Sequence, residues 1–162
     1  MYTSERHSFL RNVLFEAHAL RGLIEPHFGP ETAAPGWTGK VPSAGHCAVV
    51  SALLSARGLP DEPEARVECV SVTLESGSHW FNRVTRGNLS VDIDLTGDQF
   101  GHSPVRVADP DDLYEERARL RKHEDLNEET LGRARMLAQK AGLDLEFGCQ
   151  MESRKGRKAP LS

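Results

Sequence analysis

The sequence predicts an α+β fold in which a buried helix packs on an antiparallel sheet. Two helical patterns come first, at residues 8–24 and 47–57, and the second is apolar on nearly every face. Three β-rich runs follow between residues 65 and 95, and the last two form a credible hairpin. Helical patterns return after residue 110. Helices, then neighbouring strands, then helices again is the order typical of an α+β protein.

Composition limits the classes of function that the chain can have. Its 162 residues are 38% hydrophobic and 27% charged, which is the balance of a soluble globular protein. A net charge of −4 gives no general attraction for nucleic acid. The sequence contains no apolar run long enough for a membrane helix and no apolar leader near Met1, so we expect a cytoplasmic protein that binds neither nucleic acid nor membrane. Three cysteines, an odd number, favour free thiols over a disulfide framework.

The first expected helix covers Ser8 to Ile24. Its apolar residues recur at three- and four-residue intervals, as in an amphipathic helix: Phe9, Leu10, Val13, Leu14, Ala17, Leu20 and Leu23. Ser4 is a plausible N-cap, and Pro26 prevents the helix from continuing. Residues 26–42 are rich in proline and glycine and are expected to be irregular.

The second expected helix begins at Cys47 and ends near Arg57. It is predicted to be central and buried, because apolar residues occupy most of its surface. Gly58 suits the position after the last turn, and Pro60 follows closely.

Three strands are expected next, at residues 65–73, 78–84 and 89–95. Arg86-Gly87-Asn88 provides the turn of a hairpin between the last two. In the third strand, apolar residues 89, 91, 93 and 95 alternate with Ser90, Asp92, Asp94 and Thr96. Because side chains alternate between the two faces of a strand, both aspartates are predicted on the face opposite the apolar one.

Beyond Pro110 the sequence predicts two charged helices, Asp111 to His123 and Asn127 to Ala141. The first is expected to present a solvated face of i,i+4 charge pairs formed by residues 115–122. We expect residues 1–150 to form one domain and residues 151–162, which are basic, to form a flexible tail.

Cys47 is the candidate nucleophile. A thiol attacks effectively as a thiolate, which a helix N-terminus and a nearby imidazolium both stabilise. The N–H groups of the first helical turn could also donate to the oxyanion of an attacked carbonyl. The alternative is a buried cysteine that packs as a small hydrophobe. Cys69 and Cys149 are interpreted as inert thiols.

His79 is the candidate base, because it lies on a strand that the hairpin brings beside the polar face of the next strand. Asp94 is the candidate acid that orients the imidazole, with Asp92 as the alternative, and we expect one of the two aspartates to be solvent-exposed.

Candidates for the oxyanion hole or the substrate pocket are Trp37, His46, Trp80 and Gln99. An alternative is a zinc site formed by Cys47, His46, His79 and an aspartate. The paired ligand spacings of structural zinc sites are missing from the sequence, so we expect no metal and no cofactor.

Three segments resemble the YunG-like bacterial family. Residues 45–53, GHCAVVSAL, resemble its GQCAVTAL signature; residues 77–83, GSHWFNR, resemble GSHYWNR; and residues 93–100, IDLTGDQF, resemble IDLTxxQF. The similarity extends roughly from Trp37 to Ala141. His46 stands where the family has Gln, and Asp94 aligns with the family aspartate.

The order Cys, His, Asp also resembles the transglutaminase-like branch of the papain-like fold. That resemblance implies a nucleophilic thiol that acts on amide or related acyl groups. We therefore expect a thiol-dependent acyl-transfer enzyme that takes a peptide or a small amide or acyl substrate. Hydrolysis, deamidation and transfer to an amine all remain open, as does the oligomeric state. The alternative function is a non-catalytic binding or regulatory domain with the same fold.

Overall fold

The computed structural model describes residues 2–122 and 125–147, and this part of the chain is α+β as predicted. It contains three α-helices, α1 (Tyr2–Ile24), α2 (Cys47–Arg57) and α3 (Glu128–Lys140), and two short 3-10 turns, η1 (Glu25–His27) and η2 (Gly97–Phe100). The strands are β1 (Arg66–Leu74), β2 (Gly77–Arg86), β3 (Leu89–Asp94), β4 (Arg106–Ala108) and β5 (Arg119–Arg121). They form one antiparallel sheet in the order β4-β3-β2-β1-β5. The predicted tail at 151–162 lies outside the described residues.

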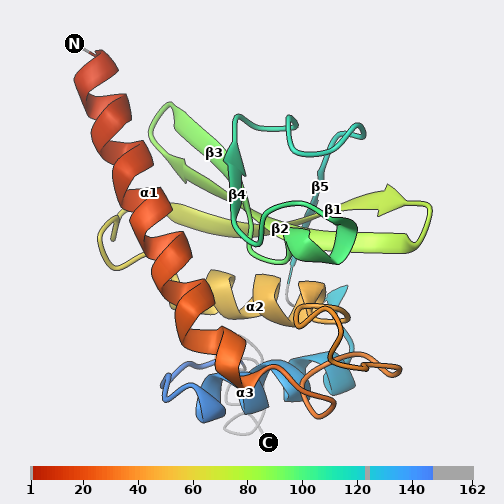
Figure 1. Ribbon diagram of the computed structural model, residues 1–162. Helices are drawn as coiled ribbons and strands as arrows, with labels where there is room; N and C mark the ends of the chain where they lie inside the picture. Colours follow the sequence, from red (N-terminus) through yellow and green to blue (C-terminus); the bar gives the residue numbers. More distant parts are fainter. Residues whose placement is uncertain (1, 123–124, 148–162) are drawn as a thin grey trace, which may run out of the picture.

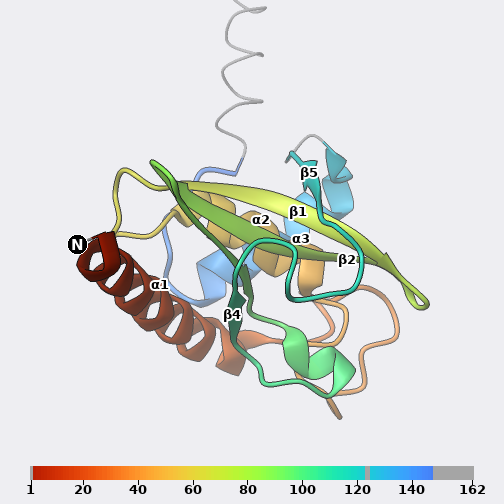
Figure 2. The same cartoon turned by 90° about the horizontal axis from the view of Figure 1, so that it is seen from above.

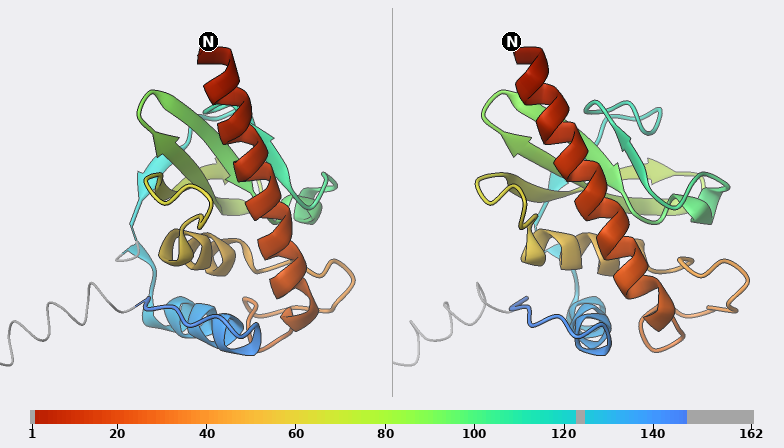
Figure 3. Two further views of the ribbon diagram at one scale, coloured as in Figure 1. Left: turned by 90° about the vertical axis from the view of Figure 1, so that its left-hand side faces the viewer. Right: turned by 60° about the vertical axis from the view of Figure 1, so that its left-hand side comes forward.

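The helices lie on one face of the sheet in two further layers. α2 packs against β1 and β2, and α3 packs on the other side of α2 (Figure 3). α1 runs obliquely across this stack and contacts both β3 and α3 (Figures 1 and 2). Because α2 is covered by the sheet and by α3, it has the central position that its apolar composition predicts.

The main core lies between this face of the sheet and the helices. α1 contributes a stripe of fully buried side chains at three- and four-residue spacing, and β3 contributes its alternating apolar residues, so that the cluster includes Phe9, Val13, Leu20, Leu53, Val91 and Ile93. Full burial of one such side chain contributes about 2 kcal/mol. α1 begins earlier than the sequence predicts, at residue 2 rather than residue 8. None of the helices in the described part of the chain has the length and apolar character needed to cross a bilayer.

Two polar contacts fix α2 on β2. The hydroxyl of Ser51 donates to the carbonyl of Phe81 at 2.8 Å, and the Asn82 side-chain amide donates to the carbonyl of Ser51 at 3.0 Å. Gly58 ends the helix at φ +69°, and its N–H bonds the carbonyl of Leu54. The helix therefore starts at Cys47 and ends at Arg57, the bounds that the sequence predicts.

The β2–β3 hairpin turns within the predicted segment Arg86-Gly87-Asn88, but the turn itself has two residues, because Arg86 still belongs to β2. Arg86 pairs with Leu89, which leaves Gly87 and Asn88 at the tip, and Gly87 has φ +60°. A glycine with positive φ at the first central position is what a type II′ turn requires. The pairing places Arg83 opposite Asp92, so these two side chains share the face that is turned away from α2.

The predicted helix Asp111 to His123 is wrong in its described part. Residues 111–118 form a bend and irregular backbone, and residues 119–121 pair with β1 as β5. Asp111 has φ +70°, a left-handed conformation that an α-helix cannot contain. Its backbone N–H donates to Asp92, and its carboxylate accepts from Ala118 N–H and Arg83. These tertiary bonds outweigh the weak helical preference of the charged segment.

The segment 109–118 instead covers the second face of the sheet (Figure 1). Leu113 packs there with Val70, Val72 and Phe81 in a second apolar cluster. The expectation that Asp92 or Asp94 is solvent-exposed is consequently wrong, since their exposed fractions are 0% and 1%. Alternation located the aspartates on the correct face, but it carried no information on what covers that face.

Candidate active site

Cys47 opens α2 at the edge of a cavity of about 530 Å³. The loop before the helix passes very close to residues 33 and 34. A Cβ at Gly45 would lie 3.1 Å from the backbone nitrogen of Ala34, and Gly45 has φ +76°, so only glycine fits here without strain. The Cys47 side chain is half-buried and lines the cavity together with His79, Gln99 and Phe100.

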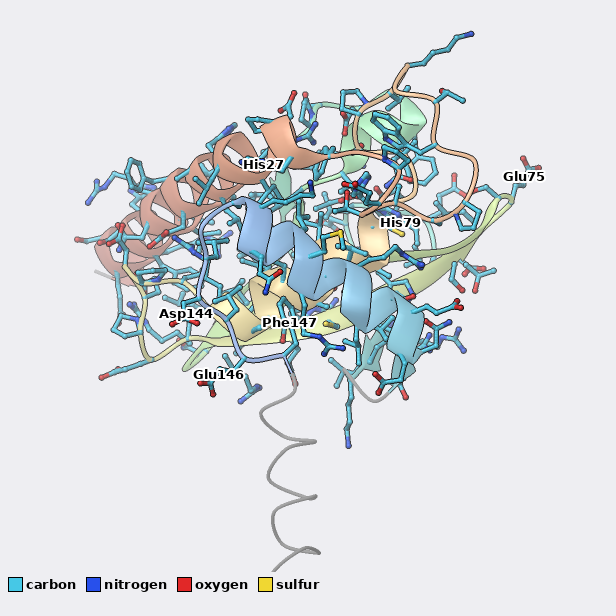
Figure 4. All side chains as sticks on the ribbon, turned by 90° about the horizontal axis from the view of Figure 1, so that it is seen from below. His27, Glu75, His79, Asp144, Glu146 and Phe147 are labelled. Atoms are coloured by element: carbon cyan, nitrogen blue, oxygen red, sulfur yellow. The ribbon has the colours of Figure 1, made fainter. Side chains whose placement is uncertain are left out.

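His79 and Asp94 form a buried pair. The Nε2 atom of His79 lies 2.8 Å from Oδ2 of Asp94, and each side chain is 1% exposed. The β2–β3 register brings the two together, because both belong to the face of the sheet turned away from α2 and lie at the same end of their strands. Figure 4 shows His79 beside one end of α2, well inside the tip of the β1–β2 hairpin that carries Glu75.

The second ring nitrogen of His79 is available for chemistry. Nδ1 is buried and makes no hydrogen bond with a described residue. The Cys47 thiol lies close enough to interact with the ring and contributes to its shifted pKa. Nε2 is held by the carboxylate, so Nδ1 is the atom that can exchange a proton with sulfur.

Asp94 remains ionised because its hydrogen-bond partners compensate for its burial. Burial raises the pKa of this carboxyl, but hydrogen bonds and charge from His79, together with the Tyr114 hydroxyl and the Thr96 N–H, bring it below the ordinary value. Oδ1 accepts from the Thr96 N–H at 2.9 Å and from its hydroxyl at 3.2 Å, while Oδ2 accepts from Tyr114 as well as from His79. The carboxylate is thus fixed in orientation.

The imidazole of His79 is charged at neutral pH for the same reason. Burial lowers the pKa of His79, but the hydrogen bond to Asp94 and the interaction with Cys47 outweigh burial and raise the pKa to about 9. An imidazolium next to a thiol at a helix N-terminus favours the thiolate. The arrangement therefore supplies a nucleophile and a proton donor at the same cavity.

Tyr114 belongs to the site but was not identified from the sequence. Its ring lies edge-on to His79 at 5.2 Å between centroids, and its hydroxyl bonds Asp94. Burial raises the pKa of Tyr114, so the hydroxyl stays a neutral donor. One sequence feature could have indicated it: the apolar pair Leu113-Tyr114 lies inside an acidic run. A fully solvated helix gives no reason for two large apolar side chains at these positions. Phe100 closes the other side of the imidazole, with centroids 4.7 Å apart.

Gln99 is the one oxyanion or pocket candidate that lines the cavity. Its Oε1 accepts from the Gly45 N–H at 3.4 Å, while its Nε2 is buried without a partner among the described residues. η2 holds Gln99 there because the neighbouring Asp98 accepts hydrogen bonds from Arg21 at 2.9 and 3.0 Å and from Ser43 at 2.5 Å. An unused amide donor beside Cys47 is suited to stabilising an oxyanion.

The other candidates do not line this cavity. Trp37 donates to the Pro42 carbonyl at 3.0 Å, and Trp80 stacks beneath the guanidinium of Arg121. His46 is fully buried, with Nε2 2.7 Å from the Thr32 hydroxyl and Nδ1 3.1 Å from the Ala44 carbonyl. These contacts give all three a structural role.

Asp92, the alternative acid, pairs with Arg83 instead of with His79. The guanidinium donates to both carboxylate oxygens, at 2.7 and 3.0 Å, and also to Asp111. Asp92 therefore ties the covering segment to the sheet. No three histidine, cysteine or carboxylate side chains of the described residues are grouped so that they could hold a metal ion.

Comparison with known proteins finds one family. A sequence model of the YunG protein family matches residues 16–139, a range that includes Cys47, His79 and Asp94. The same comparisons match the chain to no curated protein and to no solved structure.

Proposed function

The chain belongs to the YunG family, and from the geometry of its cavity we propose that it is a thiol-dependent acyl-transfer enzyme. Cys47 is the nucleophile, His79 the acid-base group and Asp94 the group that orients the imidazole. One observation carries the proposal: His79 is bound to Asp94 through Nε2, its Nδ1 has no hydrogen-bond partner among the described residues, and its ring lines the same cavity as the thiol at the start of α2.

The reaction proceeds in two halves. The Cys47 thiolate attacks the acyl carbon of an amide or ester, forming a carbon–sulfur bond and placing negative charge on the carbonyl oxygen. When the tetrahedral intermediate collapses, the bond to the leaving group breaks, and Nδ1 of His79 gives its proton to that group. Water or an amine then attacks the thioester, neutral His79 accepts the proton of the incoming nucleophile, and the thiolate is released.

Two donors are placed to stabilise the oxyanion. The backbone N–H of Cys47 lies in the first turn of α2, where a helix leaves its N–H groups without intrahelical acceptors. The side-chain Nε2 of Gln99, which has no partner within the described part of the chain, supplies the second donor from η2. Donors fixed in advance at a water-poor site lower the barrier without having to reorganise.

The proposal extends to fold and substrate. A nucleophile at the start of a buried helix, with its histidine and aspartate on neighbouring antiparallel strands, supports a papain-like fold of the transglutaminase-like kind. The cavity suits a peptide side chain or a small amide or acyl compound, and the protein is proposed to act in the cytoplasm. Hydrolysis and transfer to an amine share every step up to the thioester.

Alkylation of Cys47 by iodoacetamide at pH 6 tests the proposal. We expect Cys47 to react at least tenfold faster than a small free thiol, because an imidazolium and a helix N-terminus beside a thiol increase its reactivity. His79→Ala is expected to reduce the rate to that of a free thiol. His18→Ala, which removes an exposed imidazole from α1, is the matched control and should leave the rate unchanged. Mass spectrometry of the peptide containing Cys47 separates its modification from that of other cysteines.

Slow alkylation that does not depend on His79 would contradict the proposal. It would instead favour a non-catalytic binding or regulatory domain, in which Cys47 is a half-buried structural thiol.

A further inference from the structure

We propose that the cavity selects acyl substrates that carry a carboxylate, and that Arg133 binds this group. The inference rests on the proposed acyl-transfer function of the same cavity. It adds a residue that determines specificity, supplied by α3 rather than by the catalytic elements.

The cavity wall carries one permanent charge, and that charge is positive. Arg133 lines the cavity together with Cys47, His79 and Gln99, and none of the described residues that line it is an aspartate or a glutamate. The chain as a whole is acidic, with a net charge of −4. A cationic cavity in an acidic protein concentrates anionic ligands at that point.

Arg133 lacks a carboxylate partner, which most partly buried arginines of the described residues have; Arg106 also lacks one, but it does not line the cavity and donates to the Leu113 carbonyl. Arg21 pairs with Asp98 at 2.9 Å and Arg83 pairs with Asp92 at 2.7 Å. Within the described part of the chain Arg133 makes no ion pair: one Nη donates to the Thr130 hydroxyl at 3.1 Å, and its buried Nε has no acceptor. Withdrawing a guanidinium group from water without an anion is unfavourable, and a bound carboxylate would remove that penalty.

The remaining lining indicates which anion fits. Apart from the catalytic groups, much of the wall is apolar, from residues such as Ala34, Val41, Val49 and Phe100. This suits a short aliphatic chain between the reacting carbonyl and the anionic group. A single guanidinium matches the single charge of a carboxylate and its planar shape. A phosphate would bring a second negative charge, and the other cation of the described lining, the His79 imidazolium, is already paired with Asp94.

Three matched thiol reagents test the inference. N-iodoacetylglycine carries a carboxylate, N-iodoacetylglycinamide is its neutral counterpart, and N-iodoacetyl-aminomethylphosphonate carries a phosphonate. The rate of Cys47 modification is measured at pH 8.5 by peptide mass spectrometry. Relative to the same ratio for a small free thiol, we expect Cys47 to prefer the carboxylate over the amide by about tenfold, the contribution of one charge-assisted hydrogen bond.

Substitutions assign the preference to one residue. Arg133→Gln is expected to abolish it and Arg133→Lys to retain part of it. Arg135→Gln is the matched control, because it removes the same charge from α3 at a position that pairs with Glu128 and does not line the cavity; it should leave the preference intact. Circular dichroism verifies that each variant is folded.

An unchanged carboxylate-to-amide ratio in Arg133→Gln would overturn the inference, and faster reaction of the phosphonate would overturn the choice of carboxylate. These outcomes are separate from failure of the proposed function. At pH 8.5 an ordinary thiol also reacts, so the ratio can be measured even if Cys47 is not activated at pH 6.

Discussion

Two buried histidines lie close to Cys47, and their pKa values move in opposite directions. His46 directly precedes α2, and burial, the largest influence, lowers its pKa to about 4. Burial acts in the same direction on His79, yet the pKa of His79 rises to about 9 because of Asp94 and Cys47. Burial alone therefore makes an imidazole neutral, and a buried carboxylate partner makes it charged.

The partners of His46 are those of a neutral imidazole. Nδ1 donates to the Ala44 carbonyl, and Nε2 accepts from the Thr32 hydroxyl, while the ring lies against Phe28 with centroids 4.2 Å apart. Both nitrogens are occupied, so no site remains for proton exchange. His79 differs in having one nitrogen on a carboxylate and the other without a partner among the described residues, in a ring that lines the cavity, which is what an acid-base group needs.

Removing the carboxylate should make His79 resemble His46. Asp94→Asn is expected to lower the pKa of His79 below its ordinary range and to slow alkylation of Cys47 at pH 6 by roughly a hundredfold. Asp92→Asn is the matched control on the same strand. It leaves Arg83 without its main partner and should lower the free energy of unfolding by roughly 3 kcal/mol, while the folded protein keeps its alkylation rate. Equal loss of alkylation in both variants would show that Asp94 acts only through stability.

His79 and His46 are also expected to change the free energy of unfolding at opposite ends of the pH range. The raised pKa of His79 contributes stability that is fully present below its ordinary value of 6.5 and is lost as pH rises through about 9. The lowered pKa of His46 contributes stability that is present above 6.5 and is lost as pH falls toward about 4. Urea unfolding is therefore expected to give a maximum near pH 6.5, with losses of about 1 kcal/mol at pH 5 and about 2 kcal/mol at pH 8.5.

Variants separate these two contributions. His79→Gln should flatten the alkaline limb alone, and His46→Gln the acid limb alone. A curve whose alkaline limb persists in His79→Gln would assign that limb to another group.

Local patterns predicted the parts of the site that local sequence determines. The bounds of α2 follow from its apolar composition and from Gly58, and the hairpin turn follows from Gly87. Period-two alternation located Asp94 on the face of His79, and the family resemblance favoured it over Asp92. The structure places Asp94, and not Asp92, on the imidazole.

The remaining parts depend on long-range contacts that leave no periodic signal. β4 and β5 have three residues each, which is too short to show alternation. The charges of residues 111–122 favour a solvated helix locally, whereas the ion pairs with Arg83 and the pairing with β1 determine their structure. For this reason the sequence did not identify Tyr114 as a residue of the site. Arg133 lies within a correctly predicted helix, but its place at the cavity depends on how α3 packs against α2.

The most direct test of this account is an NMR titration of the two imidazoles in protein labelled with ¹³C-histidine, with signals assigned through His46→Gln and His79→Gln. We predict that His79 stays charged up to about pH 9 and that His46 stays neutral down to about pH 4. A His79 signal that titrates at or below 6.5 would contradict the central claim, because the buried pair with Asp94 would then not supply the charged imidazole that activates Cys47.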